Sequence, residues 1–521
     1  MPIHTQSSYG EERNPREEVR VSEVGLWIFI IGFLFMLAVP PVAREFSRDG
    51  IRGDAAQIIF GRGTKVVDRL RAFEKRVDEA SWVKPLRQGA QWVVTSLFRE
   101  GNRKVFIGTD RRLYLRTGLR ALTGYGALTP EPRSVAKDPA LGDWQPPLPI
   151  IEDFAGQLRE RGARLVLVPV PDKAAVLLNT GESDRIPPHP SAERFYQALT
   201  EAGVQTIRLD EWRKQVSPTD ASGGFLVQDT HWNPRAMREV ARLIAAALSQ
   251  GPAPSNDAQP IKMEAVGDLV KALELPVGVA AFRPERVELL PSPVAHFSNE
   301  ESPVVLLGDS FVNIFEDTDL GWSAPACGLA AHLAHQLGQP LHVLAVNGGG
   351  ATESRERLAR LPDDIVRSKK IVLWVLAERD FFLPASAALE SKVEWRRVAF
   401  NPNKSTEGGM AGSMVVEATL KAKSALQDVL TFDYDDAVYT AEFGIDRVVS
   451  GDYSLPDAVV VLWNFKKRKV QPSARYQIGQ QFRLRLVPWL SKRELNKINP
   501  SDDFLRLDLP LLYAEEAEPL P

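Results

Sequence analysis

The spacing of hydrophobic and polar positions changes twice along the chain, near residue 150 and near residue 400. Between these points, short apolar runs alternate with segments whose apolar residues recur every three or four positions, a pattern typical of buried parallel strands and amphipathic helices. Because parallel neighbours need crossover helices, this alternation predicts an α/β/α sandwich around a parallel sheet at 150–395. The expected strands are 164–170, 204–207, 303–307, 341–346 and 370–376, and the expected helices are 151–161, 191–202, 234–248, 324–337 and 352–361.

The helical spacing disappears beyond residue 400. Runs of strand-like composition follow, and no clear helix separates them before residue 492. This pattern predicts a small all-β domain, a barrel or a sandwich, at 410–515. The expected strands are 414–421, 437–443, 458–463 and 481–487.

The most apolar stretch, VGLWIFIIGFLFMLAVPPV at 24–42, contains no charged residue and is about long enough to cross a bilayer as a helix. A polar tail, 1–23, precedes it, and no small-residue cleavage site follows. We therefore expect an uncleaved transmembrane signal anchor at 24–43, with a cleaved signal peptide and a buried core helix as the alternatives. Arginines flank the run equally, so the positive-inside rule does not give the orientation.

The segment 44–149 connects the anchor to the α/β domain, and we expect it to pack on that domain. An amphipathic stripe predicts a helix over 63–82. Apolar residues on both sides of a Gly-Thr-Asp turn predict a hairpin over 104–116. A proline-rich loop, 129–149, ends the segment.

Composition narrows the classes of function. At 521 residues, with 44% hydrophobic and 25% charged residues, the chain is expected to form two or three folded units. A net charge of -3 gives no overall field that would attract nucleic acid. The single cysteine, Cys327, excludes an internal disulfide and a thiolate metal cluster. His332 and His335 share a helix face, but no carboxylate or cysteine completes a metal site, so we predict no metal and no cofactor.

A Gly-Asp-Ser turn, 308–310, directly follows the predicted strand 303–307. The turn places the Ser310 hydroxyl at the carboxyl end of a strand, where ligands of parallel sheets bind. Taken alone, this tripeptide is also a common turn sequence.

A second motif, Asp229-Thr230-His231, lies just before the predicted helix 234–248. In extended chain, residues two apart project to the same side, so the carboxylate can hold the imidazole. By itself such a pair is also common on protein surfaces. Together with Ser310, it supplies the base and the orienting acid that an activated nucleophile needs.

With both motifs in view, the sequence resembles the SGNH-type acyltransferases of the alginate O-acetyltransferase group (AlgJ/AlgX-like). The Asp-x-His motif precedes the Gly-Asp-Ser motif, which is the order of that group and the reverse of ordinary SGNH esterases. The resemblance covers roughly residues 100–385 and implies an SGNH-like fold. The matching segments are 107–110, 168–173, 229–232 and 308–311.

The resemblance implies that Ser310 takes an acetyl group as a covalent ester, that His231 is the base and that Asp229 fixes its tautomer. For the oxyanion, the candidates are the backbone N–H of Ser310 and the segment at Asn347 and Gly348, which could equally be a glycine turn.

Ordinary SGNH esterases have an asparagine donor where this chain has Arg379. Its guanidinium could serve as a donor, hold the carboxylate of an acidic sugar, or pair with Glu378 or Asp380. Lys173 is a second substrate-binding candidate, and like Arg379 it could instead pair with an acidic residue of the protein.

The family further implies a bacterial inner-membrane protein, single-pass, with its catalytic domain in the periplasm. Its acceptor would be an exported polysaccharide, its acetyl supplier a membrane-bound O-acyltransferase, and its other partners proteins of polysaccharide synthesis and export. Two alternatives stay open: a carbohydrate acetylesterase with the same site, and a non-catalytic component of an export complex.

Overall fold

The computed structural model describes residues 83–108, 111–123, 146–177, 189–216, 223–248, 258–276, 282–294, 298–384, 393–400, 412–429, 432, 434–492, 495, 498–504 and 506–520, except the side chain of residue 490. The chain divides into two compact units, residues 1–90 and 91–521. The predicted anchor at 24–43 and the predicted helix at 63–82 lie outside the described residues. No helix within the described ranges has both the length and the apolar character needed to span a bilayer.

The second unit begins at residue 91, within the first described helix, and the predicted hairpin follows. After α4 (Val83–Val93) and a π-helical turn (Val94–Phe98), strands β1 (Val105–Ile107) and β2 (Leu113–Leu115) pair antiparallel, which confirms the prediction at 104–116. Helix α5 (Arg116–Thr123) follows directly.

A five-stranded parallel sheet forms the centre of the α/β domain, in the order β4-β3-β9-β7-β8. Every residue of β7 is buried, and so are all but the first of β3 and of β9. The predicted strands are therefore confirmed, and their apolar runs reflect burial on both faces. Their bounds are β3 (Arg164–Val170), β4 (Gln205–Thr206), β7 (Val304–Gly308), β8 (His342–Ala345) and β9 (Ile371–Ala377).

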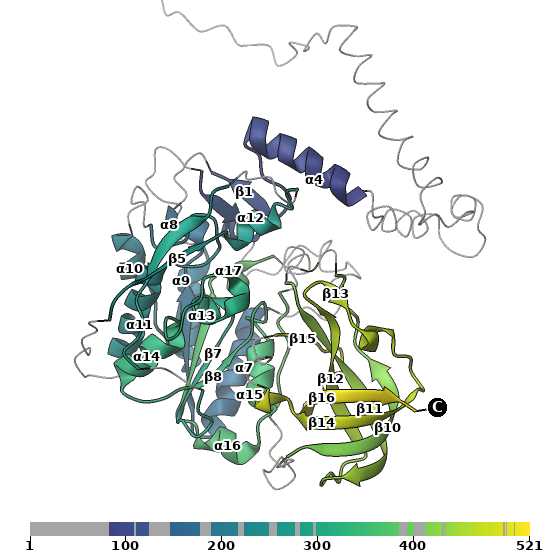
Figure 1. Ribbon diagram of the computed structural model, residues 1–521. Coiled ribbons are helices and arrows are strands. Elements are labelled where there is room, and N and C mark those ends of the chain that lie inside the picture. The colour runs from purple at the N-terminus through teal and green to yellow at the C-terminus, as the bar shows by residue number, and fades with distance from the viewer. Residues whose placement is uncertain are drawn as a thin grey trace, which may run out of the picture. The chain divides into compact units, whose positions relative to one another are not determined.

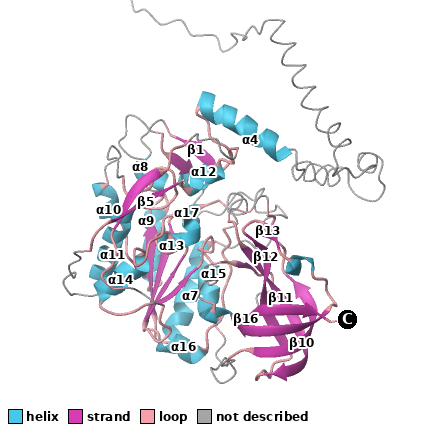
Figure 2. Cartoon of the chain, in the orientation of Figure 1, coloured by secondary structure: helices cyan, strands magenta, loops and turns pink. Residues whose placement is uncertain are grey.

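Helices cover both faces of this sheet, as Figures 1 and 2 show. Alternate strand residues face opposite cores: Val166 and Val168 belong to one cluster, Leu165 and Leu167 to the other. This is the predicted α/β/α layering. The first face carries α8 (Lys173–Leu177), α11 (Pro234–Leu248), α13 (Ser310–Asn313) and α14 (Leu329–Leu337), and the second carries α7 (Pro147–Glu160), α9 (Ala192–Glu201), α15 (Glu353–Ala359) and α16 (Asp363–Ser368).

An insertion after α11 was not predicted. Strands β5 (Ile261–Ala265) and β6 (Glu285–Leu289) pair antiparallel, and the short helix α12 (Asp268–Ala272) lies between them in sequence. The short helices α5, α8, α10 (Asp210–Gln215), α13, α16 and α17 (Arg379–Phe382) were also missed. Helix α14 is shorter than predicted, because it begins five residues later, at Leu329.

The C-terminal domain is a closed barrel. Strand β10 pairs with β11 and β14, β11 with β12, β12 with β16, and β16 with β14, so five strands form a ring. Between the predicted alternatives, barrel and sandwich, the strand pairing decides for the barrel. The ring consists of β10 (Met414–Lys423), β11 (Ala437–Ser450), β12 (Asp457–Lys466), β14 (Gln481–Pro488) and β16 (Leu511–Pro519), with β13 (Lys469–Val470) and β15 (Pro500–Ser501) at its edges.

Candidate active site

Ser310 is the first residue of α13, immediately beyond the carboxyl end of β7. The Asp309 side chain accepts a hydrogen bond from the Phe311 N–H at 2.8 Å and thereby starts the helix. Gly308 is needed for the close packing here, since a Cβ would lie 2.4 Å from the Val312 side chain and 3.0 Å from the Val375 carbonyl oxygen. The turn therefore fixes the direction of the Ser310 side chain.

His231 lies in a tight loop before α11. The Leu226 N–H donates to the His231 carbonyl at 3.0 Å, and an isolated bridge joins Phe225 to Trp232. Asn233 then caps α11, because its side-chain oxygen accepts from the Ala236 N–H at 2.9 Å. A short hairpin-like loop, closed by backbone bonds, thus presents Asp229 and His231.

The structure brings the three predicted residues, Asp229, His231 and Ser310, together as one hydrogen-bonded relay. His231 Nδ1 lies 2.6 Å from Asp229 Oδ1, and His231 Nε2 lies 2.8 Å from Ser310 Oγ. Because a carboxylate only accepts, Nδ1 carries the proton toward Asp229, and Nε2 is left to accept the Ser310 hydroxyl proton. The second oxygen of Asp229 accepts from the Trp322 indole N–H at 2.9 Å. This is the arrangement of a serine activated by an oriented imidazole.

The charges and hydrogen bonds of the relay shift the pKa values of Asp229 and His231 in opposite directions. Burial alone would raise the pKa of Asp229, but the charge of His231 and its hydrogen bond lower that pKa well below its usual range. Burial alone would likewise lower the pKa of His231, but the charge of Asp229 and its hydrogen bond, followed by the charges of Asp268 and Asp309, raise it. His231 is therefore a stronger base than a free imidazole.

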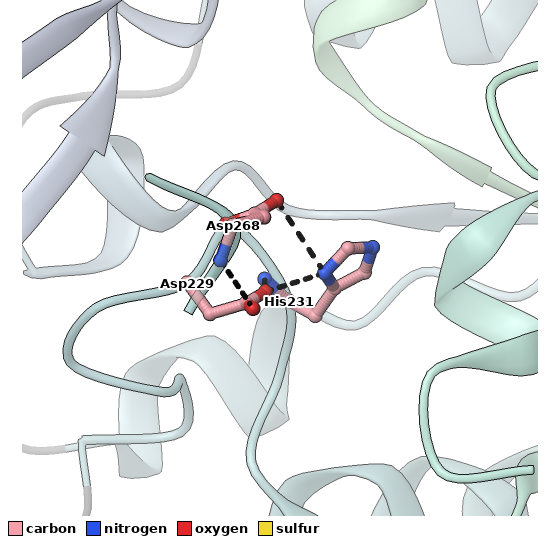
Figure 3. Close-up of side chains that lie close together, drawn as sticks. All are labelled: Asp229, His231 and Asp268. Atoms are coloured by element: carbon pink, nitrogen blue, oxygen red, sulfur yellow. Dashed lines mark hydrogen bonds and ion pairs between the residues drawn. The ribbon is translucent and has the colours of Figure 1, made fainter. Parts of the chain in front are cut away.

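A second carboxylate, Asp268 of α12, lies beside the pair (Figure 3), with Oδ2 3.9 Å from His231 Nδ1. Burial and the neighbouring Asp229 charge raise the pKa of Asp268 to about 6. Donor atoms of Asp229, His231 and Asp268 lie within 4.8 Å of one another, as they would around a metal ion. However, both oxygens of Asp229 already accept N–H bonds, and the 2.6 Å contact to Nδ1 is a hydrogen bond. The hydrogen bonds of Asp229 therefore leave this group a poor fit to a metal site.

Lys173 lies beneath the His231 loop. Its side chain is buried, and Nζ donates to the carbonyl oxygens of Val227 and Asp229, each at 2.9 Å. The ammonium also lies over the Tyr114 ring, 5.5 Å from its centre. Burial lowers the pKa of Lys173 to about 8. In this position the lysine holds the loop, and a substrate contact stays a prediction.

Arg379 directly follows β9, on α17, and lies over the Phe311 ring. Its guanidinium carbon is 5.8 Å from the centre of the Phe311 ring, and that ring in turn lies 4.8 Å from the His231 ring. Arg379 faces Asp172 at 3.6 Å and Asp380 at 3.8 Å, distances of loose ion pairs. Burial and the charge of Asp309 raise the pKa of Asp380 to about 7, although Arg379 opposes the shift. The predicted alternative of pairing with Asp380 is thus realised in a loose form, and a substrate contact stays a prediction.

Asn347 and Gly348 follow β8. The Asn347 amide donates to Asp317 at 2.7 Å and accepts from Asn313 of α13 at 2.8 Å. Gly348 has a φ of 72°, the left-handed value of a glycine turn, and its Cα side packs against the Tyr434 ring. Asn347 therefore steadies the helix that carries Ser310, and an oxyanion role for this segment stays a prediction.

Sequence reasoning missed three residues of the site: Trp322, Asp268 and Glu285. The Glu285 carboxylate accepts from the Val227 N–H at 2.9 Å and so holds the other end of the loop. For Asp268, the sequence offered one signal: Gly267-Asp268 precedes the apolar residues of α12, as is common at the start of a helix. Nothing in that signal links it to His231, which lies 37 positions earlier in the chain.

Residues 138–378 match the family model described as the SGNH hydrolase-like domain of acetyltransferase AlgX. This segment is therefore similar to the SGNH hydrolase-like domain of AlgX. The matched range contains Asp229, His231 and Ser310, and the match confirms the predicted resemblance to the AlgX acetyltransferase family.

Several solved structures are similar to the chain at low sequence identity. The O-acetyltransferase domain of Pseudomonas putida AlgJ is 20% identical, with 55% of this chain and 98% of that chain covered and a TM-score of 0.38. Pseudomonas aeruginosa AlgX is 14% identical, with 72% and 89% covered and a TM-score of 0.37. Bacillus cereus PatB1 with a sulfonyl adduct is 12% identical, with 55% and 98% covered and a TM-score of 0.31. No curated protein sequence matches the chain.

Proposed function

We propose that this chain transfers acetyl groups to hydroxyls of an exported, alginate-like polysaccharide through an acetyl-serine at position 310. The observation that supports the proposal most directly is the continuous contact from Asp229 through His231 to the Ser310 hydroxyl, at 2.6 Å and 2.8 Å. The match of the domain to the AlgX acetyltransferase model supports the transferase assignment.

In the first half-reaction, Ser310 Oγ attacks the carbonyl carbon of an acetyl ester or thioester while His231 Nε2 accepts the hydroxyl proton. The bond from the carbonyl carbon to the donor then breaks, and the imidazolium returns the proton to the leaving oxygen or sulfur. Asp229 stabilises the imidazolium in between. The products are the acetyl ester of Ser310 and the released donor.

In the second half-reaction, a sugar hydroxyl takes the place of the donor. His231 accepts its proton, the sugar oxygen attacks the acetyl-serine, and the proton passes to Ser310 Oγ as the ester bond to serine breaks. The sugar ester leaves, and the relay returns to its starting state. If water reached the ester first, the same site would be an esterase.

We further propose that the apolar run 24–43 anchors the enzyme in a bacterial inner membrane with the catalytic domain in the periplasm. The length and the lack of charge of this run support the anchor. The proposed partners are a membrane-bound O-acyltransferase that supplies the acetyl group and proteins of polysaccharide export. Arg379 is the proposed contact for a carboxylate of an acidic sugar, since its 16% exposed side chain pairs loosely with Asp172 and Asp380.

The test is a product assay with purified full-length chain in detergent, a chromogenic acetyl ester and a panel of neutral and acidic oligosaccharides. A transferase should form acetylated oligosaccharide faster than it releases acetate. Ser310→Ala should abolish transfer, whereas His335→Ala, a histidine of α14 outside the relay, should not. Acetate release that no oligosaccharide diverts would contradict the transferase assignment in favour of an esterase.

A further inference from the structure

Asp268 reaches the relay from outside the central α/β alternation. It is the first residue of α12, between the insertion strands β5 and β6. The preceding Gly267 packs so tightly on the His231 loop that a Cβ there would lie 2.1 Å from the Gln228 carbonyl oxygen. The Leu269 N–H also donates to that oxygen at 3.2 Å. The start of α12 is thus fitted to the loop, backbone against backbone.

Asp268 and the loop exchange hydrogen bonds in both directions. The Asp268 backbone N–H donates to Asp229 Oδ2 at 2.9 Å. In return, the Asp268 carboxylate accepts from the Thr230 N–H at 2.9 Å and from the Thr230 hydroxyl at 2.6 Å. The middle residue of Asp229-Thr230-His231 is therefore held by Asp268 at two points, while the acid of the relay is held at a third.

The same carboxylate also acts on the imidazole. Figure 3 shows Asp229 and Asp268 on the Nδ1 side of His231. The nearest oxygen of Asp229 lies 2.6 Å from Nδ1, and that of Asp268 lies 3.9 Å from it. The nearer one is a direct hydrogen-bond partner. The farther one is too distant for a hydrogen bond, but at this separation its charge still favours a protonated ring.

We infer that Asp268 is a positioning residue of the relay, which holds the Asp229–His231 segment by its hydrogen bonds and makes His231 a stronger base by its negative charge. The inference deepens the proposed function and rests on it for the meaning of His231 as a base. Asp268 touches neither Ser310 nor, in the proposed mechanism, the reacting atoms.

Other charged groups around His231 would keep their effect in an Asp268 variant. Asp229 lies on the same loop, Asp309 precedes α13, Lys173 lies below the loop on α8, and Arg379 faces the site from α17. A change at Asp268 should therefore shift the titration of His231 without abolishing it.

The test compares Asp268→Asn and Asp268→Ala with Glu264→Gln, which removes one carboxylate from β5 of the same insertion, where Glu264 pairs with Arg286 on the surface. The readout is the rate of Ser310 acetylation by an activated ester from pH 5 to pH 9. For Asp268→Asn, which keeps an acceptor for Thr230, the acid limb should move toward lower pH by about one pH unit, with the plateau rate within about threefold of wild type. For Asp268→Ala the plateau should also fall, by about tenfold or more. Glu264→Gln should change neither.

A second readout separates this inference from the proposed function. Carbethoxylation of His231 by diethyl pyrocarbonate requires a neutral ring but no acetyl transfer, and its rate against pH is followed on the His231 peptide by mass spectrometry. The Asp268→Asn midpoint should again lie below that of wild type, even if the chain transfers no acetyl group. A midpoint in Asp268→Asn equal to those of wild type and Glu264→Gln would overturn the inference.

Discussion

At the scale of single residues, the site depends on buried charges that compensate one another. Asp229 is 1% exposed and His231 5% exposed, so neither ionises favourably alone. Their mutual contact and the N–H donors of Trp322 and Asp268 offset the cost of burial. The histidine consequently gains basicity while its tautomer stays fixed.

The raised pKa of His231 predicts the pH dependence of acetylation. Only the neutral ring can accept the Ser310 proton, so the rate should fall as the pH drops through the pKa of His231. Because that pKa lies above the ordinary 6.5, the midpoint of the acid limb should lie above pH 6.5. A pre-steady-state acetylation profile measures it, and a midpoint below 6.5 would contradict the proposed charge balance.

Lys173 should matter for stability and for the geometry of the loop. Lys173→Met keeps the length of the side chain but leaves the Val227 and Asp229 carbonyls without their donor, so the free energy of unfolding should drop by about 1–3 kcal/mol. Lys214→Met, at an exposed pair on α10, should leave stability unchanged. Urea unfolding compares the two, and equal stability would show that the buried ammonium does not hold the loop.

At the scale of elements, the loop that carries Asp229 and His231 packs closely against the start of α12. Substitution of Gly267 tests whether this close packing matters for catalysis. In Gly267→Ala, the added Cβ would meet the Gln228 carbonyl oxygen at 2.1 Å and the Asp229 nitrogen at 2.9 Å, and backbone atoms cannot yield as a side chain can. We expect acetylation to slow by about tenfold or more through displacement of Asp229.

Gly156→Ala is the matched control. Gly156 lies in the middle of α7, and a Cβ added there would meet no other group within 4 Å, so alanine should raise stability by about 0.5–1 kcal/mol and leave the rate unchanged. If both variants kept the wild-type acetylation rate, the close fit of α12 to the loop would have no catalytic meaning.

The elements that the sequence predicted well share one property, a pattern set by local burial. Strands such as 304–308 and 371–377 are apolar throughout because helices cover both sheet faces, and α11 combined a full amphipathic stripe with the Asn233 cap. The insertion 261–289 was missed because β5 and β6 are largely exposed and lack an apolar run. The same insertion contributes Asp268 and Glu285, so their contacts with the loop that carries His231 were not predicted either.

At the scale of the whole molecule, long-range pairing decided what local patterns could not. The barrel closes through the parallel pair β12–β16, in which Val461 faces Tyr513, and no local signal specifies such a partner. The serine, histidine and aspartate could be predicted to meet because the sheet places strand ends at one edge and the two motifs follow the order of a known family. Their distances, and the roles of Lys173 and Asn347, depended on packing.

The barrel and the α/β domain contact each other through arginines of α15 and its C-terminal end. Arg357 donates to the Ile498 carbonyl at 2.7 Å, and Arg360 donates to the Arg506 carbonyl at 3.1 Å and pairs with Asp502. The Arg360–Asp502 side chains are 8% and 10% exposed, so loss of one partner leaves a buried charge. Arg360→Ala should therefore lower the free energy of unfolding by about 3 kcal/mol.

Arg485→Ala, at the exposed barrel pair with Glu516, is the control and should change stability by less than about 1 kcal/mol. Chemical unfolding followed separately by a barrel signal and by a sheet signal would measure both. Equal effects of the two substitutions would argue against a stabilising contact between the domains.

Peptide mass spectrometry after rapid mixing with an activated acetyl ester shows whether Ser310 becomes a nucleophile through His231 and Asp229. We expect an acetyl group on the Ser310 peptide of the wild-type chain and none in His231→Ala under the same conditions. Acetylation of Ser310 at the wild-type rate in His231→Ala, or acetylation of another residue in its place, would contradict this expectation.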